Sequence, residues 1–125
     1  MKHSKTWLIQ VKTISEANCS QHWSVKRKRH KMQQSVTYYS MMQHAAGIKP
    51  PVHIKLSRCE NRLLDDDNLP SSMKFLTDQI ASYFFPGLAA GRADGQKGIS
   101  FKYDQVKTFS KEDKGVLITI DWETT

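Results

Sequence analysis

Three consecutive aspartates followed by an asparagine occupy residues 65–68, in a chain whose formal net charge is +7. Carboxylates this close together repel one another. A divalent cation relieves the repulsion, because hard cations such as Mg²⁺ prefer carboxylate oxygens. If the segment is extended, Asp65 and Asp67 point to the same side, since side chains alternate along extended backbone. The spacing therefore indicates a pair of metal-binding carboxylates.

A third carboxylate, Asp94, lies in the glycine-rich segment 86–95, which we interpret as a loop. We expect the fold to bring Asp94 beside Asp65 and Asp67. Mg²⁺ held by these carboxylates would stabilise the charge that develops on a phosphate and would orient an attacking water. Lys74 would contact the scissile phosphate. These residue types predict metal-dependent phosphodiester cleavage.

A simpler interpretation of the aspartates requires no metal. Residues 65–68 could cap the helix that follows and complement the positive end of its dipole, at about 0.3–1 kcal/mol per favourable carboxylate. Capping needs only one or two acids, and three exceed that need. Lys74 could be an ordinary exposed helix lysine. Asp78 could either support a metal ligand or pair with Lys74 one turn away.

Basic residues are concentrated at 26–31, where five of six side chains carry a formal positive charge. An excess of lysine and arginine is typical of proteins that bind polyanions. The alternatives are a solvated helix face and a disordered tail. The nearby Trp23, Tyr38 and Tyr39 argue against a tail. We therefore predict an ordered surface that contacts DNA phosphates through Lys26, Arg27, Lys28, Arg29 and Lys31, together with Arg92 and Lys97 from the loop.

The length of the chain, 125 residues, fits a single domain spanning residues 1–125. No apolar run approaches the ~20 residues that cross a bilayer, and the N-terminus leads into a strand-like segment instead of an apolar signal region. Two cysteines are too few for a disulfide framework. We expect a cytoplasmic protein with no membrane partner.

Alternation of apolar residues predicts strands at 7–12, 52–58, 99–103 and 116–122. In the second of these, we expect Val52, Ile54 and Leu56 to face the core. We expect the polar residues of that strand to point mostly outward, namely His53, Lys55 and Arg58. Residues 111–115 resemble a hairpin connection between the last two strands.

Two helices are expected, over 20–46 and 69–84. The first would bury an apolar stripe and turn its basic run away from the core, and Gly47 would end it. The second would begin at Asn68. The predicted buried stripes are Val25, Met32, Val36 and Tyr39 in the first helix, and Leu69, Met73, Leu76 and Ile80 in the second. The order strand-helix-strand-helix-strand-strand predicts an α+β domain, with both helices packed on a small mixed β-sheet.

Taken in order, these motifs resemble the RusA-like Holliday-junction resolvases, in particular the phage-type members. The resemblance covers nearly the whole chain. In the N-terminal part of the chain, the matching segments are residues 15–18, His22-Trp23 and residues 27–33. In the central part they are residues 65–69, Lys74, Asp78 and Asp94. In the C-terminal part they are residues 99–103 and 114–120. The chain departs from the family where it has Ala93 beside Asp94 and where it has Ser71.

The resemblance implies a homodimeric α+β endonuclease that binds four-way DNA junctions and nicks paired strands with Mg²⁺ or Mn²⁺. By position, Asp65, Asp67 and Asp94 would bind the metal. We therefore predict a structure-selective endodeoxyribonuclease of DNA recombination and repair. A DNA-binding module without catalysis, and an enzyme with broader branched or flap substrates, are the alternatives.

Overall fold

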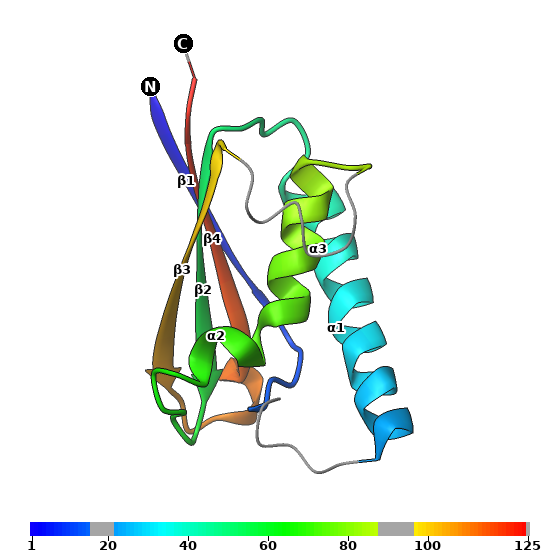
Figure 1. The fold of residues 1–125 in the computed structure, drawn as a ribbon. Coiled ribbons are helices and arrows are strands. Elements are labelled where there is room, and N and C mark those ends of the chain that lie inside the picture. The colour runs from blue at the N-terminus through cyan, green and yellow to red at the C-terminus, as the bar shows by residue number, and fades with distance from the viewer. Residues whose placement is uncertain (16–21, 88–96, 125) are drawn as a thin grey trace.

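Four strands form one sheet, and the helices cover one of its faces (Figure 1). The computed structural model describes residues 1–15, 22–87 and 97–124. The strands are β1 (Lys2–Ile9), β2 (Val52–Glu60), β3 (Ile99–Lys107) and β4 (Gly115–Glu123). The helices are α1 (Trp23–His44), the short α2 (Leu69–Ser72) and α3 (Lys74–Phe84). The expected α+β class is confirmed, although β1 begins at Lys2 instead of Trp7.

The sheet order is β1-β4-β2-β3, in which β2 and β3 are parallel and the other neighbours are antiparallel. The expected hairpin between the last two strands is therefore wrong. Ile54 of β2 lies opposite Phe101 of β3 on one side and Ile120 of β4 on the other. β4 takes an inner position, where Val116, Ile118 and Ile120 are fully buried, whereas β3 is half exposed at an edge.

The core lies between the sheet and α3. The predicted stripe of the second helix is buried at all four positions, as are the inward residues of β2 and β4. The predicted single helix is nevertheless interrupted at Met73, whose backbone (φ −117°, ψ 16°) is not helical. The buried residues from the two sides are Leu69, Met73, Leu76 and Ile80 from the helical segments, and Val52, Ile54, Leu56, Val116, Ile118 and Ile120 from the strands.

The predicted stripe of α1 is wrong. Met32 is 61% exposed and Tyr39 68% exposed, and Val25 is also exposed; only Val36 packs against the core. The side chains that α1 buries are Gln33, Thr37, Ser40 and Met41. The helix stops as expected, since Gly47 has a φ of +84°. Among the described helices, none is both long and apolar enough to cross a membrane.

Arg58 does not point outward as expected; it is only 6% exposed. It shares the parity of Ile54 and Leu56, so its side chain enters the core face of β2. Its Nε donates to Thr13 Oγ1 (2.9 Å) and its Nη2 to Thr13 O (3.0 Å). Burial lowers the pKa of Arg58, and the charge of Glu60 partly opposes that shift. A buried cation thus joins β2 to the segment that follows β1.

Candidate functional site

Residues 65–68 form a tight turn, which we call the acidic turn. The Asn68 amide donates to Asp65 O at 2.9 Å, and the Leu69 amide donates to the same oxygen at 3.2 Å. Asp66 and Asp67 are the central residues of this turn, so the extended backbone considered for residues 65–67 is wrong. All three aspartates are exposed. The turn concentrates three carboxylates on the surface next to the start of α2.

Two side chains from the sheet fix the backbone that leads into the acidic turn. The Leu64 amide donates to Gln105 Oε1, and Gln105 Nε2 donates to Leu64 O, both at 2.8 Å. Arg58 Nη1 donates to Arg62 O, also at 2.8 Å. Neither role was predicted, although Gln105 alternates in phase with the inward Phe101 and Tyr103. β2 and β3 thereby position the acidic turn.

The capping interpretation receives little support from the local geometry. Asn68 occupies the N-cap of α2, but its side chain makes no capping hydrogen bond. Within the described parts of the chain, no carboxylate of the acidic turn has a hydrogen bond or ion pair to another residue. α2 itself contains only four residues. A helix this short has little dipole for three carboxylates to complement.

Lys74 and Asp78 lie on α3. Lys74 is its first residue and is exposed, whereas Asp78 is half-buried one turn later. The interruption at Met73 separates both from the acidic turn, so Asp67 does not continue their helical phase. Lys74 and Asp78 therefore share one side of a helix, while Asp67 belongs to a separate element.

The third predicted metal ligand, Asp94, lies outside the described residues, as does Arg92. Within residues 1–15, 22–87 and 97–124, no group of three or more His, Cys, Asp or Glu side chains could hold a metal ion. The described chain thus presents two of the three predicted aspartates, Asp65 and Asp67. Both offer oxygen donors of the type that Mg²⁺ and Mn²⁺ accept.

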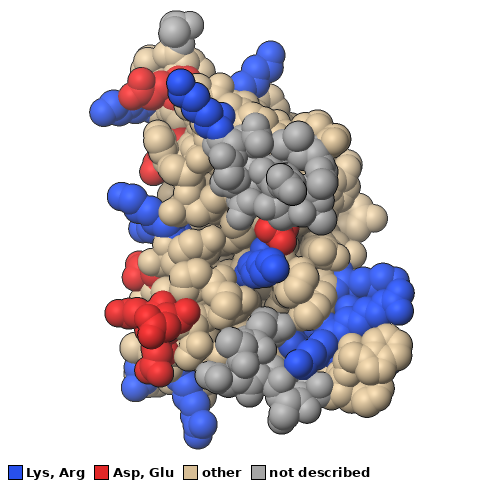
Figure 2. All heavy atoms as spheres, viewed as in Figure 1, with Lys and Arg blue, Asp and Glu red and all other residues tan. Residues whose placement is uncertain are grey.

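The predicted basic residues lie on the N-terminal half of α1. Arg27, Lys28 and Lys31 are exposed, and Lys26 and Arg29 are half-buried. Figure 2 shows basic side chains gathered over this part of α1, and acidic side chains gathered over the loop that leads into α2, on the same face of the molecule. That face therefore carries separate regions of opposite charge.

Part of this basic surface is hollowed. The hollow has a volume of about 480 Å³, and we call it the α1 hollow. It is lined by Trp23, Lys26, Arg27, His30, Lys31 and Gln34. Lys97, another predicted DNA contact, is exposed in the turn before β3. An aromatic ring among cations is a surface that can take both a base and a phosphate.

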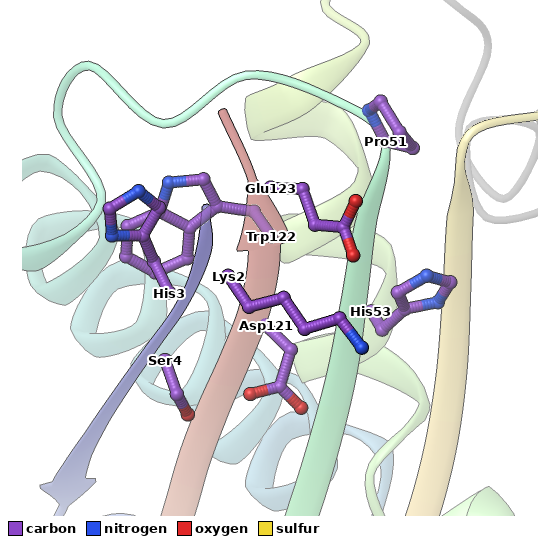
Figure 3. Close-up of a pocket in the computed structure, with 8 residues that line it drawn as sticks. All are labelled: Lys2, His3, Ser4, Pro51, His53, Asp121, Trp122 and Glu123. Carbon is purple, nitrogen blue, oxygen red and sulfur yellow. The ribbon is translucent and has the colours of Figure 1, made fainter. Parts of the chain in front are cut away.

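The uncovered face of the sheet has a second hollow, near the two ends of the chain (Figure 3). Figure 3 shows Lys2 extending across β4 toward His53. The His3 and Trp122 rings stack at 5.2 Å, and His53 Nδ1 lies 2.6 Å from Ser100 Oγ. Asp121 and Glu123 also line it. Its charges are mixed in sign, unlike those of the α1 hollow.

No protein-family model, curated protein sequence or solved structure matches this chain. The resemblance to RusA-like resolvases therefore rests on the order and spacing of the motifs, and the roles that it implies stay predictions.

Proposed function

We propose that this protein is a metal-dependent, structure-selective endodeoxyribonuclease that resolves four-way DNA junctions by paired nicking, in DNA recombination or repair. Asp65, Asp67 and Asp94 bind Mg²⁺ or Mn²⁺, and Lys74 contacts the phosphate. The active form is a homodimer, because two symmetric strands are cut. The observation that carries the proposal is the acidic turn: three exposed carboxylates in a basic protein, on a turn whose preceding backbone is held by the sheet.

The acidic turn supports catalysis by its combination of exposure and rigidity. Its carboxylates are open to solvent, so a metal and a phosphate can reach them. The backbone that leads into it is anchored by Gln105, which bonds Leu64, and by Arg58, which bonds Arg62. Metal-assisted hydrolysis needs ligands that hold their geometry, because the ion must orient the attacking water and stabilise the leaving oxygen together. A turn fixed to two strands meets that requirement.

The basic surface supports DNA binding. Arg27, Lys28 and Lys31 are exposed on a well-formed helix. Figure 2 shows basic side chains over this helix on the same face as acidic side chains over the loop that leads into α2. The basic and acidic side chains occupy separate regions of that face, so the basic surface can bind the arms of a DNA substrate while the carboxylates hold the metal. The alternative, a junction- or duplex-binding module without catalysis, needs only this surface.

Labelled DNA substrates distinguish these functions. The purified protein is incubated with a four-way junction, a three-way junction, a flap and a linear duplex, in Mg²⁺, in Mn²⁺ and in EDTA, and the products are resolved on denaturing gels. We expect symmetric nicks in opposite strands of the four-way junction, with metal only. Light scattering of the complex in EDTA should give two protein chains per junction.

Two results would contradict the proposal. Binding to the junction without a nick in either metal would favour the non-catalytic module. Nicks of equal rate in the flap and the four-way junction would favour an enzyme of broader specificity.

A further inference from the structure

We propose that Trp23 and the α1 hollow bind an unpaired base of single-stranded DNA, with Arg27 and Lys31 on the adjoining phosphates. Trp23 is 64% exposed, whereas Trp7 is 7% exposed and Trp122 packs against the core. Single exposed apolar residues are common on protein surfaces and need no function. Trp23 differs because its ring lines a hollow together with cationic side chains.

The helix places these groups along one strip. Arg27 is one turn from Trp23 and Lys31 is two turns away, so the three side chains follow each other on one side of α1. Gln34 continues the strip and can donate to or accept from a base edge. A stacking ring followed by regularly spaced cations is the pattern that binds a single strand along its backbone.

Local contacts hold the first turn and the middle of this strip in place. His22 occupies the N-cap of α1, and its Nδ1 accepts a hydrogen bond from the Ser24 amide at 3.2 Å, which fixes the turn that carries Trp23. The His22 and Trp23 rings lie 5.7 Å apart at 34°. Near the middle of the strip, the His30 ring stacks on Phe75 of α3 at 3.8 Å. A preorganised surface loses less entropy when a ligand binds.

The chemistry of the α1 hollow favours unpaired DNA over duplex DNA and over an apolar protein segment. Bases in a duplex are already stacked on each other, so their faces cannot stack on Trp23, whereas unpaired bases present free faces. An apolar helix would bring no negative charge to Arg27 and Lys31. The inference rests on the proposed function in that branched DNA offers unpaired bases in a flap, or at a branch point where base pairs open.

The test measures binding of the full chain, in EDTA, to a fluorescein-labelled oligothymidylate and to a blunt duplex of the same length. We expect Trp23→Ala to weaken binding to the single strand about 5- to 150-fold, since base stacking on an aromatic ring supplies that range. Duplex binding should change less than about twofold, because only phosphates are contacted. Trp23→Phe should retain most single-strand affinity, as phenylalanine keeps a stacking face.

Tyr39→Ala is the matched control, since Tyr39 is an equally exposed aromatic residue on α1 outside the hollow. It should leave both affinities unchanged. Equal weakening of single strand and duplex by Trp23→Ala, or no weakening of either, would overturn the inference, as would failure of the parent protein to bind oligothymidylate. Junction nicking in Mg²⁺ is measured on the same preparations. If Trp23→Ala does not selectively weaken single-strand binding but the parent protein nicks the junction, this inference alone is refuted. If Trp23→Ala weakens single-strand binding but the parent protein does not nick the junction, the proposed nuclease alone is refuted.

Discussion

The helices α1 and α3 cover the same face of the sheet, yet they use their apolar residues in opposite ways (Figure 1). α3 buries Leu76 and Ile80 completely. α1 buries one large apolar side chain, Met41, beside polar ones such as Gln33, and leaves others such as Met32 in solvent. α3 thus contributes mainly to the core, whereas the outer side of α1 contributes little to the core and is available for a ligand.

The polar contacts that α1 buries explain how it stays attached. Gln33 Nε2 donates to Lys12 O, in the segment after β1, at 2.6 Å. The His44 ring stacks on Trp7 at 4.9 Å, and Lys5 Nζ donates to His44 O. Hydrogen bonds and ring stacking therefore orient α1 on β1, and its basic residues are left facing outward.

The largest effect should come from removing a core side chain of α3. Ile80→Ala deletes fully buried methylene groups beneath the sheet, so the free energy of unfolding should fall by about 2–5 kcal/mol. Met32→Ala on α1 should change it by no more than about 0.5 kcal/mol, because its side chain is already in solvent. Urea unfolding followed by circular dichroism measures both. Equal losses would show that α1 packs against something in solution.

A buried cation should be the next most sensitive position. Arg58→Met keeps much of the side-chain volume but leaves Thr13 O and Arg62 O without their donor, so we expect a loss of about 1–3 kcal/mol. Lys55→Met, at an exposed position of the same strand, is the control and should be nearly neutral. If Arg58→Met matched the control in urea unfolding, Arg58 would not anchor the acidic turn.

The basic side of α1 should affect binding without affecting stability. Arg27→Ala with Lys31→Ala should lower the slope of log K against log salt for duplex DNA by about 2, since two phosphate contacts are lost. The free energy of unfolding should stay within about 0.5 kcal/mol of the parent value. The control is the double variant Lys102→Ala with Lys107→Ala, which removes two positive charges from β3 instead of α1. An identical slope change in that control would mean that net charge alone binds DNA.

Much of the fold was predictable where apolar periodicity and burial coincide. They coincide in α3 and in the alternating residues of β2 and β4, and those predictions are confirmed. They disagree in α1, because the pattern of apolar residues selects Met32 and Tyr39, whereas the side that packs is mostly polar and includes one large apolar residue, Met41. The hairpin was wrong because neighbours in sequence need not pair, and β4 instead lies between β1 and β2.

The candidate site was predictable in composition but less so in geometry. The run of aspartates is visible in the sequence, whereas its turn depends on Gln105, which is distant in the chain. Arg58 was predicted to point outward, although it is an even number of residues from the inward Ile54 and Leu56 and so shares their side of the strand. Asp94 lies outside the described residues, so its place beside the acidic turn stays a prediction.

Nicking of a four-way junction by Asp67→Asn, compared with Asp66→Asn, tests the central claim most directly. Both variants lose one exposed negative charge from the same turn, but only Asp67 is assigned to the metal. We expect Asp67→Asn to reduce the nicking rate at least about 100-fold in Mg²⁺ while junction binding in EDTA persists, since loss of a metal ligand removes stabilisation of the transition state. Asp66→Asn should stay within a few-fold of the parent protein. Equal rates for the two variants would contradict the assignment of the acidic turn as the catalytic metal site.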